Sequence, residues 1–113
     1  MHEMSIALSI IDAVIARAEQ ENSQKVNQVE LEVGSVSGVL PESLKFCFSA
    51  AAKNTIVEGA DLTIHEKEPL RRCDACGNHF QATDFIAKCV NCGSLKTTII
   101  SGRELLIKSI TLD

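Results

Sequence analysis

The chain has 113 residues, a length that suits one main domain with one small appendage. Its formal net charge is -4 and it contains no basic run, so nucleic acid and anionic membranes are disfavoured as main partners. No apolar run is long enough to span a bilayer and the N-terminus lacks the features of a secretory signal, so we expect a cytoplasmic protein.

Residues 4–22 are predicted to form the first helix. Apolar side chains recur there with the 3.6-residue period of a helix that packs one face against a core, and polar side chains occupy the other face. The apolar face is expected to hold Met4, Ala7, Leu8, Ile11, Val14, Ile15 and Ala18.

Residues 25–34 are predicted to form the first strand. Apolar and polar residues alternate along it, which is typical of a sheet with one buried and one exposed face. We expect the core-facing residues to be Val29, Leu31 and Val33. Two glycines in the segment 34–38 indicate a loop after the strand.

A second helix is predicted to begin near Pro41, because proline is tolerated in a first helical turn, where its missing N–H has no helical partner. The helix is expected to end within the segment 54–59. Cys47 is interpreted as a core residue and not as a ligand, since a buried free cysteine behaves as a small hydrophobe. The apolar face of this helix is expected to hold Leu44, Cys47, Phe48, Ala51 and Ala52.

Two further strands are predicted, over residues 60–66 and 103–112. In the first of them, Leu62 and Ile64 are expected to point inward. In the second, the apolar residues change parity, which indicates a bulge or cover on both faces.

The segment between these two strands carries two Cys-x-x-Cys pairs, the strongest signal in the sequence. Within each pair, two intervening residues let both sulfurs approach one ion, and the glycine that follows eases a sharp turn. Four thiolates form a closed tetrahedral site, which favours structural zinc over iron. The predicted zinc ligands are Cys73, Cys76, Cys89 and Cys92.

Three other interpretations of these cysteines are less well supported by the sequence. Disulfides are rare in the cytosol, a thioredoxin-like centre has a single pair near a βαβ unit, and a catalytic zinc needs an open coordination position. The segment contains few core residues besides Phe80, Phe85 and Ile86, so it is expected to form a two-stranded ribbon that folds when metal is bound.

The order of elements predicts an α+β fold in which a three-stranded sheet packs with two helices and a zinc-ribbon domain is inserted before the last strand. The expected domains are residues 1–69 with 100–113, and residues 70–99 for the ribbon.

The first three residues form a second candidate metal site. Met1 is expected to be retained because His2 is too large for the usual trimming, so a free α-amine stands beside the histidine. The amine, the backbone nitrogen of His2 and the His2 imidazole can form two fused chelate rings. Three nitrogens in one plane suit Ni(II) or Cu(II), and Glu3 can add a carboxylate oxygen or its amide.

The sequence resembles the HypA/HybF family of hydrogenase maturation factors, which are nickel metallochaperones. The resemblance covers essentially the whole chain and rests on the Met-His-Glu start, the GSVSGV loop, the helix with Leu-Lys-Phe-Cys-Phe, and the two cysteine pairs before the Lys-Ser-Ile-Thr strand. It implies that nickel binds through the extreme N-terminus, with His2 as the key ligand and Glu3 beside it. It also implies that the four ribbon cysteines bind structural zinc.

The resemblance further implies delivery of nickel to the large subunit of [NiFe]-hydrogenase together with a HypB-type GTPase, and a role in urease maturation for some members. An adaptor whose zinc ribbon binds a protein partner, without a transferable metal, is the alternative. We expect no enzyme activity, because the sequence shows no nucleophile–base pair, phosphate-binding loop or open catalytic metal site. We expect a monomer or a weak homodimer, and Glu42, His65 and His79 are assigned no ligand role.

Overall fold

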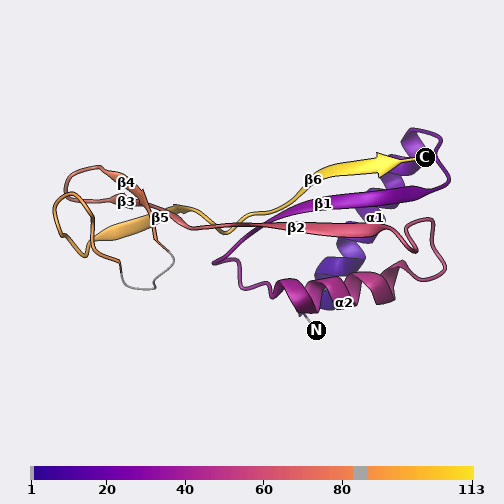
Figure 1. Cartoon of the computed structure of the whole chain (residues 1–113), viewed down its shortest axis with the longest axis horizontal. Helices are drawn as coiled ribbons and strands as arrows, with labels where there is room; N and C mark the ends of the chain where they lie inside the picture. The colour runs from indigo at the N-terminus through magenta and orange to yellow at the C-terminus, as the bar shows by residue number, and fades with distance from the viewer. Residues whose placement is uncertain (1, 83–86) are drawn as a thin grey trace. The chain divides into compact units, whose positions relative to one another are not determined.

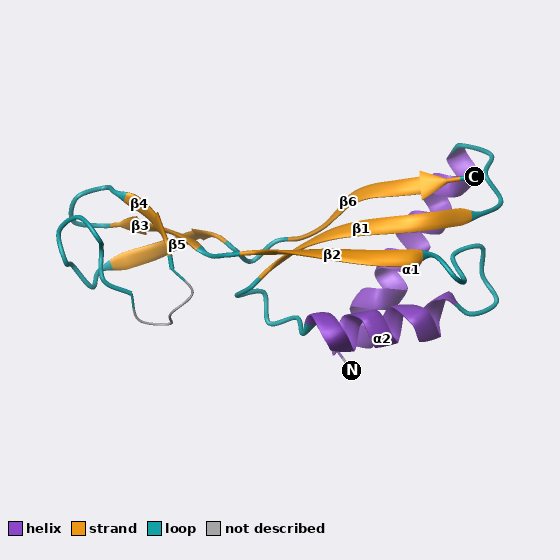
Figure 2. Cartoon of the chain, in the orientation of Figure 1, coloured by secondary structure: helices purple, strands orange, loops and turns teal. Residues whose placement is uncertain are grey.

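The computed structural model describes residues 2–82 and 87–113 (Figure 1). Two helices and two three-stranded sheets make up the described fold, so the α+β class predicted from the sequence is confirmed (Figure 2). In chain order the elements are α1 (His2–Gln20), β1 (Val26–Gly34), α2 (Pro41–Ala52), β2 (Asp61–Lys67), β3 (Leu70–Cys73), β4 (His79–Gln81), β5 (Thr97–Ser101) and β6 (Leu105–Leu112).

The first sheet has the strand order β2-β1-β6, with β1 at its centre. β2 runs parallel to β1, because side-chain hydrogen bonds join the two strands at one constant offset, from Gln28 to Thr63 and from His65 to Glu30. β6 runs antiparallel to β1, because backbone hydrogen bonds link their ends in the opposite order. A parallel pair needs a crossover connection, and α2 supplies it.

The alternation predicted for β1 is confirmed, since its apolar residues are buried and form the centre of the core beside the first sheet. The apolar face predicted for α2 is confirmed at its main positions, and Cys47 is a core residue that is only 3% exposed. Helices α1 and α2 pack against each other. The buried residues of β1 and α2 include Val29, Leu31, Val33, Leu44, Cys47 and Phe48.

Two expectations about the first helix are wrong. The helix begins at His2 and not at Met4, since neither His2 nor Glu3 disfavours a helix and an acidic side chain in the first turn suits the helix dipole. Leu8, expected in the core, is 49% exposed, because the buried face of the helix is narrower than expected and does not include it. The buried face consists of Ala7, Ile10, Ile11, Val14 and Ala18.

A tight backbone junction forms where the loop after β1 meets the segments on either side of the second sheet. The N–H of Ser35 donates to the carbonyl of Lys67, and the N–H of Val36 donates to the carbonyl of Gly102. A side chain on Gly34 would collide with the backbone of Gly102, so glycine is required at this position by close approach.

The second sheet has the order β4-β3-β5 and is antiparallel throughout. The prediction of a two-stranded ribbon is therefore wrong, because the sheet has a third strand. β5, which is rich in β-branched residues, pairs with the other edge of β3. Phe85 and Ile86, expected in the ribbon core, lie outside the described residues. The described core cluster of this sheet is small and consists of Cys73, Phe80, Ala87 and Cys89.

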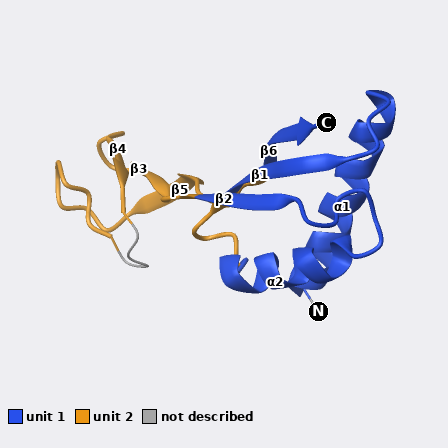
Figure 3. Ribbon diagram, turned by 45° about the vertical axis from the view of Figure 1, so that its right-hand side comes forward, with its two compact units in different colours: residues 1–32, 39–65, 106–113 blue, residues 33–38, 66–105 orange. Residues whose placement is uncertain are grey.

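The chain divides into two compact units (Figure 3). One comprises residues 1–32, 39–65 and 106–113, and the other comprises residues 33–38 and 66–105. The second unit therefore contains the backbone junction as well as the second sheet. The domain boundaries expected from the sequence stay a prediction.

In the part of the chain that the structure describes, neither helix has the length and apolar character needed to cross a bilayer.

Candidate metal centre

The four cysteines of the second unit lie in two knuckles that have the same backbone hydrogen bonds. In the first knuckle, the N–H of Cys73 donates to the carbonyl of Asn78, and the N–H of Gly77 donates back to the carbonyl of Cys73. The second knuckle repeats both bonds sixteen residues later, from Cys89 to Ser94 and from Gly93 to Cys89. The two Cys-x-x-Cys pairs are therefore built as matching turns.

The glycine after each pair is needed for its backbone conformation. Gly77 has a φ of 79° and Gly93 a φ of 77°, in the left-handed region that other residues rarely adopt. Because the backbone turns sharply at these positions, both cysteines of each pair present their sulfurs on the same side.

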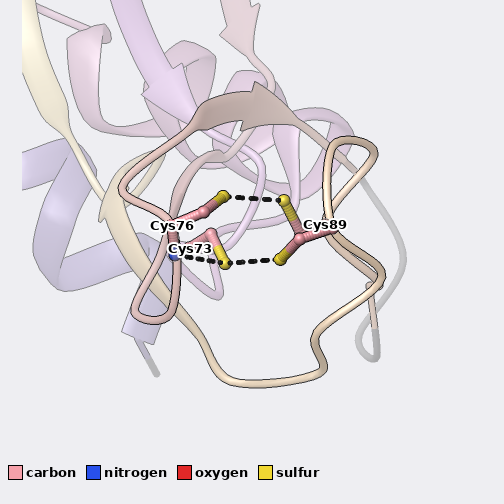
Figure 4. A group of neighbouring side chains, drawn as sticks. Cys73, Cys76 and Cys89 are labelled. Carbon is pink, nitrogen blue, oxygen red and sulfur yellow. Dashed lines mark hydrogen bonds between the residues drawn. The ribbon is translucent and has the colours of Figure 1, made fainter.

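The knuckles face each other and bring all four sulfurs together (Figure 4). The Sγ atoms of Cys73 and Cys92 are 3.6 Å apart, as are those of Cys76 and Cys89, and all four sulfurs lie within 4.8 Å of one another. Zinc bound at about 2.3 Å from each thiolate would place tetrahedral sulfurs about 3.8 Å apart. The cluster is therefore suited to zinc, and all four cysteines are free of disulfides.

Backbone and side-chain N–H groups point at these sulfurs. The N–H of Cys76 donates to the Sγ of Cys73 at 3.4 Å, and the N–H of Asn91 donates to the Sγ of Cys89 at 3.4 Å. Asn91 also donates from its side-chain Nδ2 to the Sγ of Cys76, at 3.6 Å. Hydrogen bonds of this kind stabilise the thiolate form that binds metal.

The thiols differ in how readily they ionise. Burial opposes ionisation of Cys89, but the backbone N–H groups of Cys92 and Asn91 outweigh it and lower the pKa of this thiol to about 6. The backbone N–H of Asn78 and the Asn91 side chain lower the pKa of Cys76. For Cys92, the backbone N–H of Ser94 favours the thiolate, yet the neighbouring sulfurs and burial prevail and raise its pKa to about 12. Four thiolates so close together would repel one another unless a cation lay between them.

The N-terminal candidate site lies in the first unit, at the start of α1. The Nδ1 atom of His2 lies 3.7 Å from the Oε2 atom of Glu3. The His2 side chain is 63% exposed, whereas that of Glu3 is 15% exposed. Met1, predicted to contribute its amine, lies outside the described residues.

The residues left without a role occupy different positions. Glu42 lies in the first turn of α2, where it shares a shallow cavity with Met4. His79 is exposed on β4 and does not belong to the cysteine cluster. His65 lies on the exposed face of the first sheet, and its Nε2 is 2.7 Å from the Oε2 of Glu30. This bond is the main cause of a lowered pKa of the Glu30 carboxyl.

Sequence reasoning missed Asn91, which touches sulfurs of both knuckles. The signal available in the sequence was the asymmetry between the two pairs, because Ala75 occupies the matching position in the first knuckle. Spacing rules identify metal ligands, but they say nothing about residues that donate hydrogen bonds to those ligands.

Comparison with protein families gives one match that spans nearly the whole chain. The family model described as "Hydrogenase/urease nickel incorporation, metallochaperone, hypA" matches residues 1–112. A protein of Chlorobium phaeobacteroides named hydrogenase maturation factor HypA is 64% identical over the full length of both chains. A protein of the same name from Francisella philomiragia is 35% identical, again over the full length of both.

Solved structures share the fold at lower sequence identity. The solution structure of the Ni metallochaperone HypA from Helicobacter pylori has a TM-score of 0.69 and 21% identity, covering 97% of this chain and 96% of that one. A second solution structure, of a HypA protein, has a TM-score of 0.74 and 23% identity, covering 99% and 96%.

Proposed function

This chain belongs to the HypA family of hydrogenase and urease nickel-incorporation metallochaperones, and we propose that it binds Ni(II) at its N-terminus and delivers the ion for maturation of [NiFe]-hydrogenase. The observation that carries the proposal is the family match along residues 1–112, which includes the terminal residues with ligand chemistry. Nickel is the cargo, and in our proposal the zinc is a permanent part of the protein.

The proposed nickel ligands are the His2 imidazole, the Met1 amine and, as a further donor, Glu3. The position of His2 supports this assignment, because the first N–H groups of a helix have no partner within the helix. A backbone nitrogen there can lose its proton to a metal without breaking a helical hydrogen bond. The exposed His2 side chain leaves the ion accessible to a partner.

The start of a helix also limits how tightly nickel is held. The N-terminal end of the α1 dipole is positive and weakens the binding of a cation there. The negative charge of the Glu3 carboxylate counteracts this repulsion. Binding also requires the imidazole and the amine to lose their protons, so nickel affinity falls as the pH falls. A site with these properties releases its ion readily, which suits cargo.

We propose that Cys73, Cys76, Cys89 and Cys92 hold one structural Zn(II), supported by sulfurs that lie within 4.8 Å of one another. A four-thiolate site leaves no open position, so the zinc supplies folding energy and not catalysis. In this proposal residues 70–99 form the zinc-ribbon domain, and residues 1–69 with 100–113 form the nickel-binding domain.

We propose that the partners are a HypB-type GTPase and the large subunit of [NiFe]-hydrogenase, with urease maturation proteins as further clients. The protein acts in the cytoplasm as a monomer or a weak homodimer and catalyses no reaction of its own. Its family membership supports a role in maturation.

The experiment is a nickel titration of zinc-loaded protein with an authentic N-terminus. We expect one Ni(II) to bind with a Kd below about 10 μM, and His2→Ala to weaken binding by about 100-fold, since it removes one ligand. His79→Ala is the matched control, because it removes an exposed histidine elsewhere. Equal affinity of wild type and His2→Ala would refute the proposal and favour the adaptor alternative.

A further inference from the structure

The two knuckles match in their backbone but differ in one side chain beside the sulfurs. Position 75, before the second cysteine of the first pair, is alanine, whereas position 91 in the second pair is asparagine. Only the asparagine has an amide that can reach beyond its own turn. The asparagine side chain of the second knuckle therefore has no counterpart in the first knuckle.

Asn91 connects the two knuckles through two different atoms. Its backbone N–H donates to the Sγ of Cys89, which belongs to its own knuckle. Its side-chain Nδ2 donates to the Sγ of Cys76, which belongs to the other knuckle. These two sulfurs are 3.6 Å apart, so Asn91 donates hydrogen bonds to two neighbouring sulfurs of the four-cysteine cluster.

The side-chain bond lies where the cluster is most open. Cys73 and Cys89 are buried, whereas Cys76 and Cys92 are exposed. An exposed thiolate is the one that water, a proton or a competing chelator reaches first, so its detachment begins metal release. A hydrogen bond from a neutral amide holds the Cys76 sulfur in place without adding charge, and groups that orient ligands in this way typically alter metal affinity by about 10- to 100-fold.

We propose that Asn91 is a positioning residue of the four-cysteine centre, and that its side-chain amide holds Cys76 against the opposite knuckle and slows the release of zinc. The inference rests on the proposed zinc site. It assigns Asn91 no role as a ligand.

The first test measures how fast the zinc-loaded full-length protein gives up its metal to an excess of a colorimetric chelator. Asn91→Ala keeps the backbone N–H that donates to Cys89 and removes only the side-chain bond, making the second knuckle resemble the first. We expect zinc release about 10-fold faster or more. Val90→Ala is the matched control, because this neighbouring side chain is 80% exposed, and it should release zinc at the wild-type rate.

A second measurement uses the wild-type protein, so it does not depend on how the variant folds. With ¹¹³Cd in place of zinc, a hydrogen bond to a metal-bound sulfur transmits scalar coupling, and the Asn91 side-chain amide protons should correlate with the metal. Absence of that correlation, or equal release rates for wild type and Asn91→Ala, would overturn the inference while leaving the zinc site intact. A wild type that takes up no zinc would instead overturn the zinc site and the inference with it.

Discussion

Cys89→Ser is expected to weaken zinc binding by about 10²- to 10³-fold and to destabilise the second unit around the knuckles. The substitution removes one of the four thiolates of the proposed zinc site. Structural zinc typically binds with an apparent free energy on the order of 10–16 kcal/mol, so losing about a quarter of it costs roughly 2.5–4 kcal/mol. The described core of the second sheet cannot compensate, because two of its four buried residues are themselves cysteines of the cluster.

A zinc competition titration and amide NMR spectra would measure this result. We expect signals of the second unit to collapse toward disordered positions, while those of the first unit, which has its own core, persist. Cys47→Ala is the matched control: Cys47 is equally buried but lies on α2, so its loss should lower stability without changing zinc content. A zinc affinity in Cys89→Ser equal to that of the wild type would show that the four cysteines do not form one site.

Gly34→Ala is expected to destabilise the protein by about 3–6 kcal/mol, because the new methyl group meets backbone and not a movable side chain. Its Cβ would lie 1.9 Å from the carbonyl oxygen of Gly102 and 2.6 Å from the nitrogen of Arg103. The two segments must separate, and the bonds from Gly34 to Glu104 and from Val36 to Gly102 weaken with them.

Urea denaturation checks this expectation against Gly38, which lies in the loop that follows Gly34. Gly38 has a φ of 82°, but a Cβ added there would meet nothing within 4 Å, so Gly38→Ala should cost only the conformational penalty of about 1–2 kcal/mol. If Gly34→Ala were no more destabilising than Gly38→Ala, the close packing of the junction would be wrong.

The features predicted well from the sequence are those that local pattern determines. The alternation of Val29, Leu31 and Val33 follows from a strand with one buried face, and Pro41 marks the first residue of α2. The cysteine pairs were recognisable because spacing alone limits which sulfurs can meet at one ion. The glycine conformations after each pair follow from the same turn.

The features that were missed depend on tertiary context. Leu8 is exposed and Ile10 is buried because of the side of α1 on which the core lies. A 3.6-residue period is compatible with a buried face that includes either residue, so the pattern alone does not decide between them. β5 adds to β3 through pairings such as Arg71 with Ile99, which a pattern in one segment does not reveal. Asn91 acts on a cysteine fifteen residues away, so no local rule identifies it.

X-ray absorption spectra at the nickel and zinc edges of the doubly loaded, untagged protein decide whether the two metals occupy separate sites. We expect a zinc shell of four sulfurs at about 2.3 Å and a nickel shell of nitrogen and oxygen without sulfur. The nickel shell should lose its imidazole signature in His2→Ala, while the zinc shell stays unchanged. Sulfur in the nickel shell, or nitrogen in the zinc shell, would contradict a protein that carries nickel at its N-terminus and keeps zinc in its knuckles.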